Sequence, residues 1–300
     1  MKTLDLFCGC GGMSLGFEKA GFNIVAAYDL WDTAVETYNA NFKHKALCKD
    51  INTLSVEEIK ELNPDIIIGG PPCQDFSSAG KRDESLGRAE LTDVFAKKIC
   101  DFKPNWFVME NVDRIVKSNK LTKIKQAFTK ARYGLTEFIL DASLCGVPQK
   151  RKRYFLVGGM NEKNDFLSAC IFSCISSYPM SIRDYMGEDL DMEHYYRHPR
   201  SYNRRGVFSI DEPSPTIRGV NRPIPKNYKF HEGDTCKNID EIRPLTFNER
   251  AQIQTFPKNF IFLGNKTDRE QMIGNAVPVK LAQYVGEVLL KYIKETAKIT

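Results

Sequence analysis

The chain has 300 residues, of which 42% are hydrophobic and 27% are charged, and its formal net charge is +5. These values exclude a disordered or fibrous chain and allow one large globular domain, or a large and a small one. No apolar run approaches the roughly 18 residues that a membrane-spanning helix needs, and the N-terminus lacks a signal-peptide pattern. We therefore expect a cytoplasmic protein whose nine cysteines stay reduced.

The first half of the sequence alternates strand patterns with helix patterns. Short runs rich in β-branched and aromatic residues predict strands at 3–7, 24–30, 66–70, 105–112, 135–142 and 153–159. Amphipathic spacing and closing glycines predict helices at 13–21, 32–42 and 122–134. This alternation predicts an α/β fold with a doubly wound, mostly parallel sheet and helices on both faces.

The alternation stops near residue 160. From there to about residue 240 the chain is rich in Arg, Pro, Tyr, Ser and Asn and has few long apolar runs, which predicts a smaller, loop-rich second domain. Helices are predicted again at 245–256 and 279–298, and the apolar stripe of the second indicates docking on the core. We predict a catalytic and cofactor-binding domain over 1–159, completed by 268–300, and the small domain over 160–267.

Two basic clusters indicate contact with an anionic partner. The segment 197–229 contains eight Arg and Lys residues against two acidic ones, and the run QKRKR occupies 149–153. Such clusters suit a nucleic-acid backbone, although each alone is equally typical of a solvated surface.

Four residues have the chemical types of a zinc site: Cys170, Cys174, His194 and His198. The span between the two pairs is longer than in a simple zinc finger, and the segment around the cysteines reads as apolar filler. We therefore predict no metal, while the sequence leaves open whether these residues bind anything.

The stretch DLFCGCGG places glycines between the first predicted strand and the first predicted helix. A doubly wound sheet binds nucleotide-like ligands at this place, although a purely structural tight turn is the alternative. Asp29 ends the second predicted strand, where an acidic residue can accept hydrogen bonds from ribose hydroxyls. The spacing fits NAD, FAD and S-adenosylmethionine equally well.

Cys73 lies in the stretch GGPPCQDFSS, directly after a predicted buried strand. A nucleophilic cysteine must be reachable and partly deprotonated, and the carboxyl end of a strand in such a sheet is where ligands bind. Pro71 and Pro72 stiffen the backbone, and the two preceding glycines allow a bulky group to approach. The alternative is an ordinary thiol.

Glu110 ends another predicted strand and is expected to reach the same cleft. A carboxyl group there can act as a general acid, or donate to a ring nitrogen when it is protonated. The alternative is a strand-end carboxylate in a salt bridge.

Six stretches together, in chain order, resemble the DNA cytosine-5 methyltransferases over most of the chain. They are DLFCGCGG, GGPPCQDFS, MENV, QKRKR, RPLTFNERAQIQTFP and MIGNAVP. Six ordered matches are far more specific than one. The resemblance implies a Rossmann-like methyltransferase fold, S-adenosyl-L-methionine as cofactor, and duplex DNA as partner, with the small domain as the target-recognition domain.

The resemblance also assigns roles to individual residues. Cofactor binding falls to Phe7, Gly9, Gly11, Gly12, Asp29, Leu30, Asp50, Ile51, Leu91 and Asn275. Catalysis falls to Cys73 as nucleophile, to Glu110 at the cytosine N3 and amino group, and to Arg151 and Arg153, which would orient the base and the catalytic loop. DNA contact falls to Gln74, Ser77, Lys81, Arg82, Arg88, Thr216, Arg218 and Arg222.

The implied reaction explains why a cysteine stands in this position. Cytosine C5 is a poor nucleophile, and addition of the Cys73 thiolate to C6, helped by Glu110 at N3, turns C5 into an enamine carbon. The base must be flipped out of the duplex to be reached. In the recognition domain, Arg218 and Arg222 are candidates for bidentate contacts to guanine, with contact to phosphate as the alternative.

Three other functions were weighed. A tRNA cytosine-5 methyltransferase usually shows a Cys-Phe-Thr signature, which this chain lacks. A non-catalytic DNA-binding relative would be expected to lose Cys73 or Glu110, and a nicotinamide dehydrogenase leaves both without a role. We expect a monomeric prokaryotic or phage modification enzyme acting on nucleoid DNA, with a restriction endonuclease for the same site encoded elsewhere.

Overall fold

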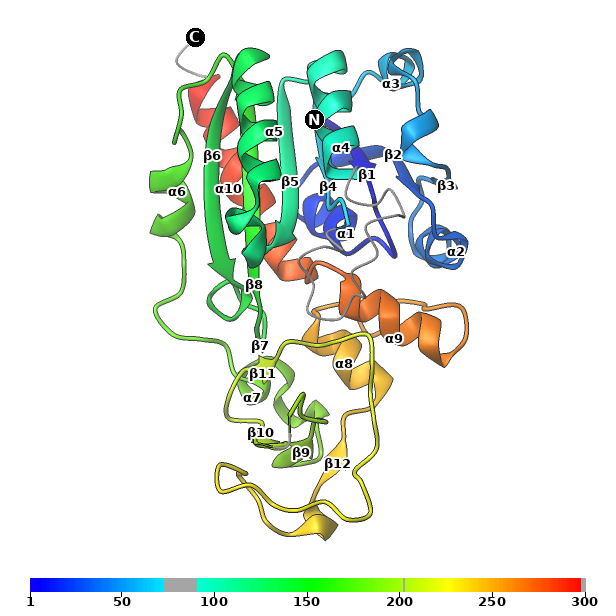
Figure 1. The fold of residues 1–300 in the computed structure, drawn as a ribbon, viewed down its shortest axis with the longest axis vertical. Coiled ribbons are helices and arrows are strands. Elements are labelled where there is room, and N and C mark those ends of the chain that lie inside the picture. Colours follow the sequence, from blue (N-terminus) through cyan, green and yellow to red (C-terminus); the bar gives the residue numbers. More distant parts are fainter. Residues whose placement is uncertain (73–90, 202, 298–300) are drawn as a thin grey trace.

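A computed structural model gives the structure of the protein and describes residues 1–72, 91–201 and 203–297 (Figure 1). Its large sheet has seven strands. In spatial order they are β3 (Ala46–Cys48), β2 (Asn23–Asp29), β1 (Lys2–Leu6), β4 (Ile66–Gly69), β5 (Trp106–Val112), β8 (Lys152–Met160) and β6 (Tyr133–Asp141). The pairs among the first five are parallel, and β8 is antiparallel to both of its neighbours.

Helices cover both faces of this sheet. One face carries α1 (Gly12–Lys19), α6 (Ser168–Ser173) and α10 (Val279–Thr296), and the other α3 (Val56–Leu62), α4 (Leu91–Phe102) and α5 (Asn119–Lys130). The strand β4 shows why: Ile66 and Ile68 belong to the core under α1 and α10, while Ile67 between them belongs to the opposite core. The predicted doubly wound, mostly parallel fold is confirmed.

The connection order creates a switch point beside β1. The chain runs outward from β1 to β2 and β3, with α2 (Asp32–Asn41) between these two, and then returns to β4 on the other side of β1. Open α/β sheets bind ligands at the carboxyl ends of their strands near such a point. The ends of β1, β2, β4 and β5 are therefore the place to look for a site.

The lower part of Figure 1 holds the second, smaller unit. It contains a sheet of β10 (Val207–Ser209), β9 (His194–Tyr196) and β12 (Arg243–Pro244), with α7 (Ile182–Met186), α8 (Phe247–Ile253) and α9 (Lys266–Asn275). Its own core includes Tyr195, Phe208 and Ile217 and continues into Ile253 of α8 and Ile273 of α9. The predicted boundaries at 160 and 267 remain a prediction.

One short parallel pair joins the two units. In it β7 (Gln149–Lys150) from the large unit pairs with β11 (Ser214–Pro215) from the small unit. Single 3₁₀ turns complete the fold: η1 (Ile51–Thr53), η4 (Asp113–Lys117), η5 (Ala142–Leu144), η6 (Gly187–Asp189) and η7 (Ile239–Glu241). Among the described helices, none is long and apolar enough to span a membrane.

The predicted strands and helices are all present, although several ends differ by a few residues. The helix predicted over 245–256 is shorter, because Thr246 caps it through a capping box with Glu249. Several further elements were not predicted, among them β3, α3, α4 and α9. They contribute one edge of the sheet, much of one helical layer, and the surroundings of the site described next.

Candidate active site

The glycine stretch forms a tight turn at the end of β1. Phe7, Gly9 and Gly11 all have positive φ, of 68°, 52° and 96°. A Cβ atom at Gly11 would lie 2.5 Å from the ring of Phe42, so no larger residue fits there. At Gly9 the same atom would meet nothing within 4 Å. The turn is therefore closely packed against Phe42 at Gly11, whereas the space beside Gly9 is open.

Asp29 ties the end of β2 to this turn. Its Oδ2 accepts a hydrogen bond from the Gly9 backbone N–H at 2.7 Å, and its Oδ1 accepts one from the Trp31 N–H at 2.9 Å. Burial raises the pKa of Asp29, and these backbone donors oppose the rise. Leu30, the next residue, leaves 68% of its surface exposed, so an apolar side chain stands beside the carboxylate.

The other predicted cofactor residues lie around the same edge. Asp50 follows β3 and caps η1 by accepting from the Asn52 N–H at 2.9 Å, and Ile51 behind it is buried. Leu91 begins α4 and is half-buried, whereas Asn275 ends α9 and is exposed.

These residues fit S-adenosyl-L-methionine. The carboxylates of Asp29 and Asp50 suit ribose hydroxyls and a positively charged ligand, because carboxylates accept hydrogen bonds and carry the opposite charge. The exposed Leu30 offers an apolar surface to a flat ring, and the open space at Gly9 lets a ligand approach the backbone.

Asp5, which the sequence reading did not single out, lies buried below the turn. Its Oδ2 accepts a hydrogen bond from Ser14 Oγ at 2.5 Å, and Ser14 in turn accepts one from the Tyr38 hydroxyl at 2.9 Å. Within the described residues its Oδ1 has no partner. Burial raises the pKa of Asp5 to about 8. The acidic first residue of DLF was the only sequence signal for this group.

Glu110 lies at the end of β5, buried and paired with Arg153 of the neighbouring strand β8. The Arg153 Nε is 2.8 Å from Glu110 Oε1. Burial raises the pKa of Glu110, and the guanidinium groups of Arg153 and Arg151 oppose that rise. A Cβ atom at Gly70 would lie 3.1 Å from Glu110 Oε2, so the chain leaving β4 passes close to this carboxyl group.

The segment that leads to Cys73 is fixed beside Glu110. Asn111 Nδ2 donates to the Pro71 carbonyl at 3.1 Å, and a Cβ atom at Gly69 would lie 2.2 Å from the Leu6 carbonyl oxygen. Six predicted site residues lie outside the described residues: Cys73, Gln74, Ser77, Lys81, Arg82 and Arg88.

Arg151 is buried, with 1% of its surface exposed, and it joins the two units. Its Nη1 donates to the Ile217 carbonyl at 3.1 Å, and its Nη2 donates to the carbonyls of Gly274 at 2.9 Å and Ala276 at 3.1 Å. The two predicted arginines thus differ in their surroundings. Arg153 contacts Glu110, whereas Arg151 donates to backbone oxygens of Ile217 in the small unit and of the chain around the end of α9.

Two glutamines that the sequence reading did not assign extend this link. Gln149 Oε1 accepts from the Ile217 N–H at 2.8 Å, and Gln149 Nε2 donates to Gln254 Oε1 at 2.7 Å. Gln254 donates onward to the carbonyls of Ile273 and Ala276. Both glutamines are fully buried. The only sequence signals that could have pointed to them were the positions of Gln149 in QKRKR and of Gln254 in QTFP.

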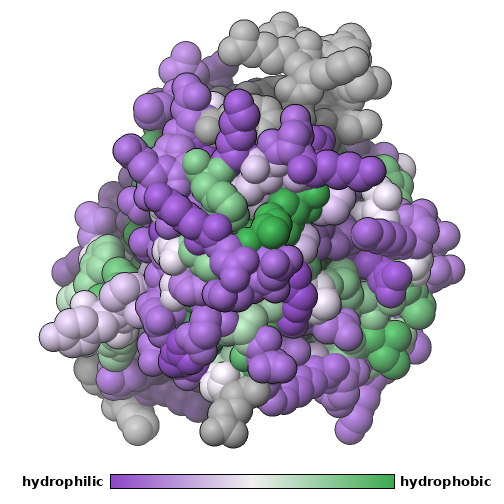
Figure 2. Space-filling view, turned by 90° about the horizontal axis from the view of Figure 1, so that it is seen from below, coloured by the Kyte–Doolittle hydropathy of each residue, from purple (hydrophilic) through white to green (hydrophobic). Residues whose placement is uncertain are grey.

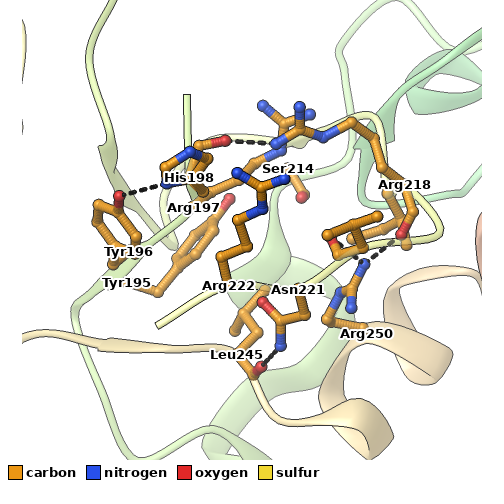
Figure 3. A pocket seen from close by; sticks show the side chains of 12 residues that line it. Tyr195, Tyr196, Arg197, His198, Ser214, Arg218, Asn221, Arg222, Leu245 and Arg250 are labelled. Carbon is orange, nitrogen blue, oxygen red and sulfur yellow. Dashed lines mark hydrogen bonds between the residues drawn. The ribbon is translucent and has the colours of Figure 1, made fainter. Parts of the chain in front are cut away.

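The predicted DNA-contacting residues of the small unit lie on one segment, 216–222. Thr216 Oγ1 donates to the Lys150 carbonyl at 2.8 Å, which places its hydroxyl beside β7. Arg218 and Arg222 line a pocket together with Arg197 and Arg250 (Figure 3). Seen from this end, the surface is mainly hydrophilic (Figure 2).

The four residues with zinc-ligand chemistry have other contacts. His194 Nδ1 is 3.1 Å from Thr235 Oγ1, and His198 Nδ1 is 3.1 Å from the Tyr196 hydroxyl. In the described ranges, no three His, Cys, Asp or Glu residues gather in a way that could hold a metal ion.

Comparisons with known proteins identify the family of the chain. Residues 1–291 match the family model described as C-5 cytosine-specific DNA methylase. The chain is 57% identical to Type II methyltransferase M.HindV of Haemophilus influenzae, over 98% of both chains. It is 52% identical to Type II methyltransferase M.HgiDI of Herpetosiphon aurantiacus, over 98% of this chain and 96% of that one.

A solved structure shares the fold at lower identity. A mutant of Spodoptera frugiperda DNMT2 superposes with a TM-score of 0.73 at 22% identity, covering 96% of this chain and 99% of that one. With the family match over nearly the whole sequence, the cofactor is S-adenosyl-L-methionine and the substrate is DNA. The chain therefore belongs to the C-5 cytosine-specific DNA methylases and is a DNA (cytosine-5-)-methyltransferase.

Proposed function

We propose that the enzyme methylates one cytosine within a short, specific sequence of duplex DNA, through a transient covalent bond between Cys73 and C6 of a flipped-out base. The observation that carries this proposal is the buried Glu110–Arg153 pair at the end of β5, with the described residues just before Cys73 running beside it. A buried carboxyl group next to the chain that leads into a cysteine supplies the two groups that the reaction needs.

The sulfur of Cys73 starts the reaction. Its lone pair forms the bond to C6, and the electrons of the C5–C6 double bond move so that C5 becomes an enamine carbon. After methylation, a water molecule takes the proton from C5. The electrons of that C–H bond re-form the C5–C6 double bond as the bond between sulfur and C6 breaks, so the thiolate departs and the ring regains its aromatic character.

Glu110 holds the proton that this addition requires. Negative charge arises on the ring as sulfur attacks, and a protonated Glu110 can donate to N3 and so neutralise it. Burial raises the pKa of Glu110, which favours its protonated form, while the neighbouring Arg153 keeps the carboxyl group oriented. The same carboxyl can accept a hydrogen bond from the amino group of the base.

The ends of β1, β2 and β3 hold the cofactor in this proposal. Asp29 accepts hydrogen bonds from the ribose, Asp50 and Ile51 lie at the adenine edge, and Phe7 packs on the ring. S-adenosyl-L-methionine supplies an electrophilic methyl group on a sulfonium sulfur. Leu91 and Asn275 complete the pocket on the side of α4 and α9.

The DNA approaches the edge where both units meet. A base inside a duplex cannot reach a buried carboxyl group, so it must leave the helix, at a free-energy cost of roughly a few kcal/mol. We assign sequence reading and backbone contact to segment 216–222, and contact near the flipped base to the loop that contains Gln74, Ser77, Lys81, Arg82 and Arg88.

The names of the relatives suggest the biological setting. The two similar proteins described above are named Type II methyltransferases, and we infer that this enzyme likewise protects DNA within a restriction–modification system. Its partner would be an endonuclease that cleaves the same unmethylated sequence, with no direct contact implied. We further propose that the methyltransferase acts as a monomer on its DNA.

Bisulfite sequencing tests the proposal directly. Plasmid DNA is treated with the purified enzyme and S-adenosyl-L-methionine, in parallel with the Cys73→Ala and Glu110→Gln variants. We expect protected cytosines at one short sequence with the wild type, and none with Cys73→Ala. Protection by Cys73→Ala equal to that by the wild type would refute the covalent step. The same assay is repeated on tRNA, and protected cytosines in tRNA but not in plasmid DNA would refute the proposed action on duplex DNA.

A further inference from the structure

The pocket in the small unit is lined by a concentration of positive charge, which we call the arginine pocket and define by Arg197, Arg218, Arg222 and Arg250. The described residues that line it include no Asp or Glu. In the part of the chain that the structure describes, the carboxylate that forms an ion pair with this set is Glu270, which is bound to Arg250. Like charges around one pocket repel one another, and an anion among them would offset that repulsion.

The backbone holds three of these arginines in place. Arg197 Nη2 donates to the Thr216 carbonyl at 2.8 Å, Arg218 Nη2 donates to the His198 carbonyl, and Arg250 Nη2 donates to the Arg218 carbonyl at 2.5 Å. Each guanidinium has five N–H donors, so donors remain after these bonds. The pocket is thus a preorganised set of cationic donors.

Arg222 differs from the other three. It is exposed, and within the described residues it donates no hydrogen bond and forms no ion pair. In Figure 3 the side chains of Arg218 and Arg222 both extend toward His198. Arg222 is therefore the member of the set whose whole fork is available to a ligand.

The pKa shifts of the neighbouring groups follow from burial and from the same crowding of charge. Burial, and then the charge of Arg218, lower the pKa of Arg197 to about 10. Burial lowers the pKa of His198, and the charges of Arg222 and Arg218 lower it further. An anion in the pocket would reverse these effects, because it favours the charged form of each group.

The charge decides between the two ligands that DNA can offer. A guanine edge is neutral, and one arginine satisfies its O6 and N7 acceptors. A backbone phosphate carries a full negative charge and accepts several hydrogen bonds at its two free oxygens. Several cationic groups around one small pocket exceed what a single base can accept, and they match a phosphate.

We propose that the arginine pocket binds one backbone phosphate of the DNA, with Arg222 making the closing contact, and that Arg222 thus anchors the duplex rather than reads a base. The inference rests on the proposed action on duplex DNA. It has a structural consequence, because Thr216 and Ile217 of the same segment are tied to Lys150, Gln149 and Arg151. A phosphate held here fixes the duplex relative to the strands that carry Glu110 and Arg153.

The test uses Arg222→Gln and Arg222→Lys in the full-length enzyme. The matched control is Arg132→Gln, which removes one exposed charge just before β6, at the opposite edge of the sheet from the site. The probes are two short duplexes: one carries the sequence mapped by bisulfite sequencing, and the other differs in one base pair of it. The dissociation constant is measured for each between about 50 and 200 mM salt.

We expect Arg222→Gln to weaken both duplexes by the same factor. One lost phosphate contact should reduce the slope of log affinity against log salt by about 0.9, which is roughly eightfold in affinity for a tenfold dilution of salt. Arg222→Lys should keep the slope, and Arg132→Gln should behave as the wild type. An uncharged methylphosphonate at one position of the site duplex should weaken binding by the wild type more than binding by Arg222→Gln, because the variant has already lost one of the contacts to that phosphate.

Two outcomes would overturn the inference. If Arg222→Gln weakens only the duplex with the correct sequence, by tenfold or more, and leaves the salt slope intact, then Arg222 reads a base. If it changes neither duplex, the pocket holds no phosphate. In both cases the wild-type enzyme still methylates its site in the bisulfite assay, so this failure is distinct from failure of the proposed function.

Discussion

Replacing Arg250 and Glu270 singly and together should show how the small unit is held. Arg250 of α8 and Glu270 of α9 form an ion pair in which each side chain is only 5% exposed. Arg250 also donates to the Arg218 carbonyl at the start of the segment that lines the arginine pocket. The pair therefore joins the two helices to segment 216–222.

The expected losses in the free energy of unfolding follow from these contacts. Arg250→Met leaves a buried carboxylate without its cation, which costs about 3–5 kcal/mol, and leaves the Arg218 carbonyl without a donor, which costs about 1 kcal/mol more. Glu270→Gln retains an oxygen acceptor for Arg250, so we expect a smaller loss of about 2 kcal/mol. Arg250→Met with Glu270→Gln removes both charges and leaves no buried ion without its partner, so it should cost less than Arg250→Met alone.

Urea denaturation of the four proteins gives the assay. The midpoint and slope are measured by circular dichroism, and a change of midpoint at constant slope reports a change of stability. We expect the double variant to lose at least about 2 kcal/mol less of the free energy of unfolding than the sum of the two single losses. Additive losses, or a larger loss for Glu270→Gln than for Arg250→Met, would show that the pair does not act as a unit.

Three further predictions concern the cofactor edge and the catalytic carboxyl group. Because the raised pKa of Glu110 favours a protonated donor that is lost at high pH, kcat/KM for DNA should fall on the alkaline side; Glu110→Gln should lower kcat by about 10²–10⁴ and remove that alkaline fall. The pKa of Asp5 is raised from 3.8 to about 8, so its contribution to stability is fully present below pH 3.8 and is lost as the pH rises from 3.8 through 8, by up to about 6 kcal/mol. Asp5→Asn should flatten the dependence of the urea midpoint on pH over this range, and an unchanged pH dependence would contradict the burial argument. Asp29→Asn replaces one acceptor oxygen by a donor beside the Gly9 and Trp31 N–H groups, and isothermal titration should show about 10- to 100-fold weaker binding of S-adenosyl-L-methionine, with DNA binding unchanged.

Local patterns were enough to predict the sheet, because its strands are buried on both faces. The run Ile66–Ile68 is fully buried, and it reads as a strand without any knowledge of its neighbours. The edge strand β3 has three residues, two of them exposed, so it lacks an apolar signal. Helix α9 buries only Glu270, Met272 and Ile273 of its ten residues, and its start is marked mainly by the Asn265 cap.

Some parts of the site could likewise be predicted from local sequence motifs, whereas others depend on residues far apart in the sequence. Phe7, Asp29 and Glu110 lie at or near the carboxyl ends of their strands, so their common edge could be predicted from the order of the motifs and the rule for parallel sheets. The surroundings of Arg151 could not, because the carbonyls it meets at Gly274 and Ala276 lie more than a hundred residues away. Nothing in the run QKRKR separates a buried arginine from one that meets DNA.

The way in which the two units are joined bears on how recognition reaches the catalytic edge. Hydrophobic contacts alone are non-directional and tolerate small shifts, whereas hydrogen bonds to particular carbonyls fix one register. Arg151, Gln149 and Gln254 make such bonds, all buried, and two of them hold Ile217 directly. Moving segment 216–222 would leave several buried donors unpaired, and each would cost about 1–3 kcal/mol of free energy. If the duplex binds on segment 216–222 as we propose, these bonds would hold it in one position relative to Glu110, and the unpaired donors would disfavour other positions.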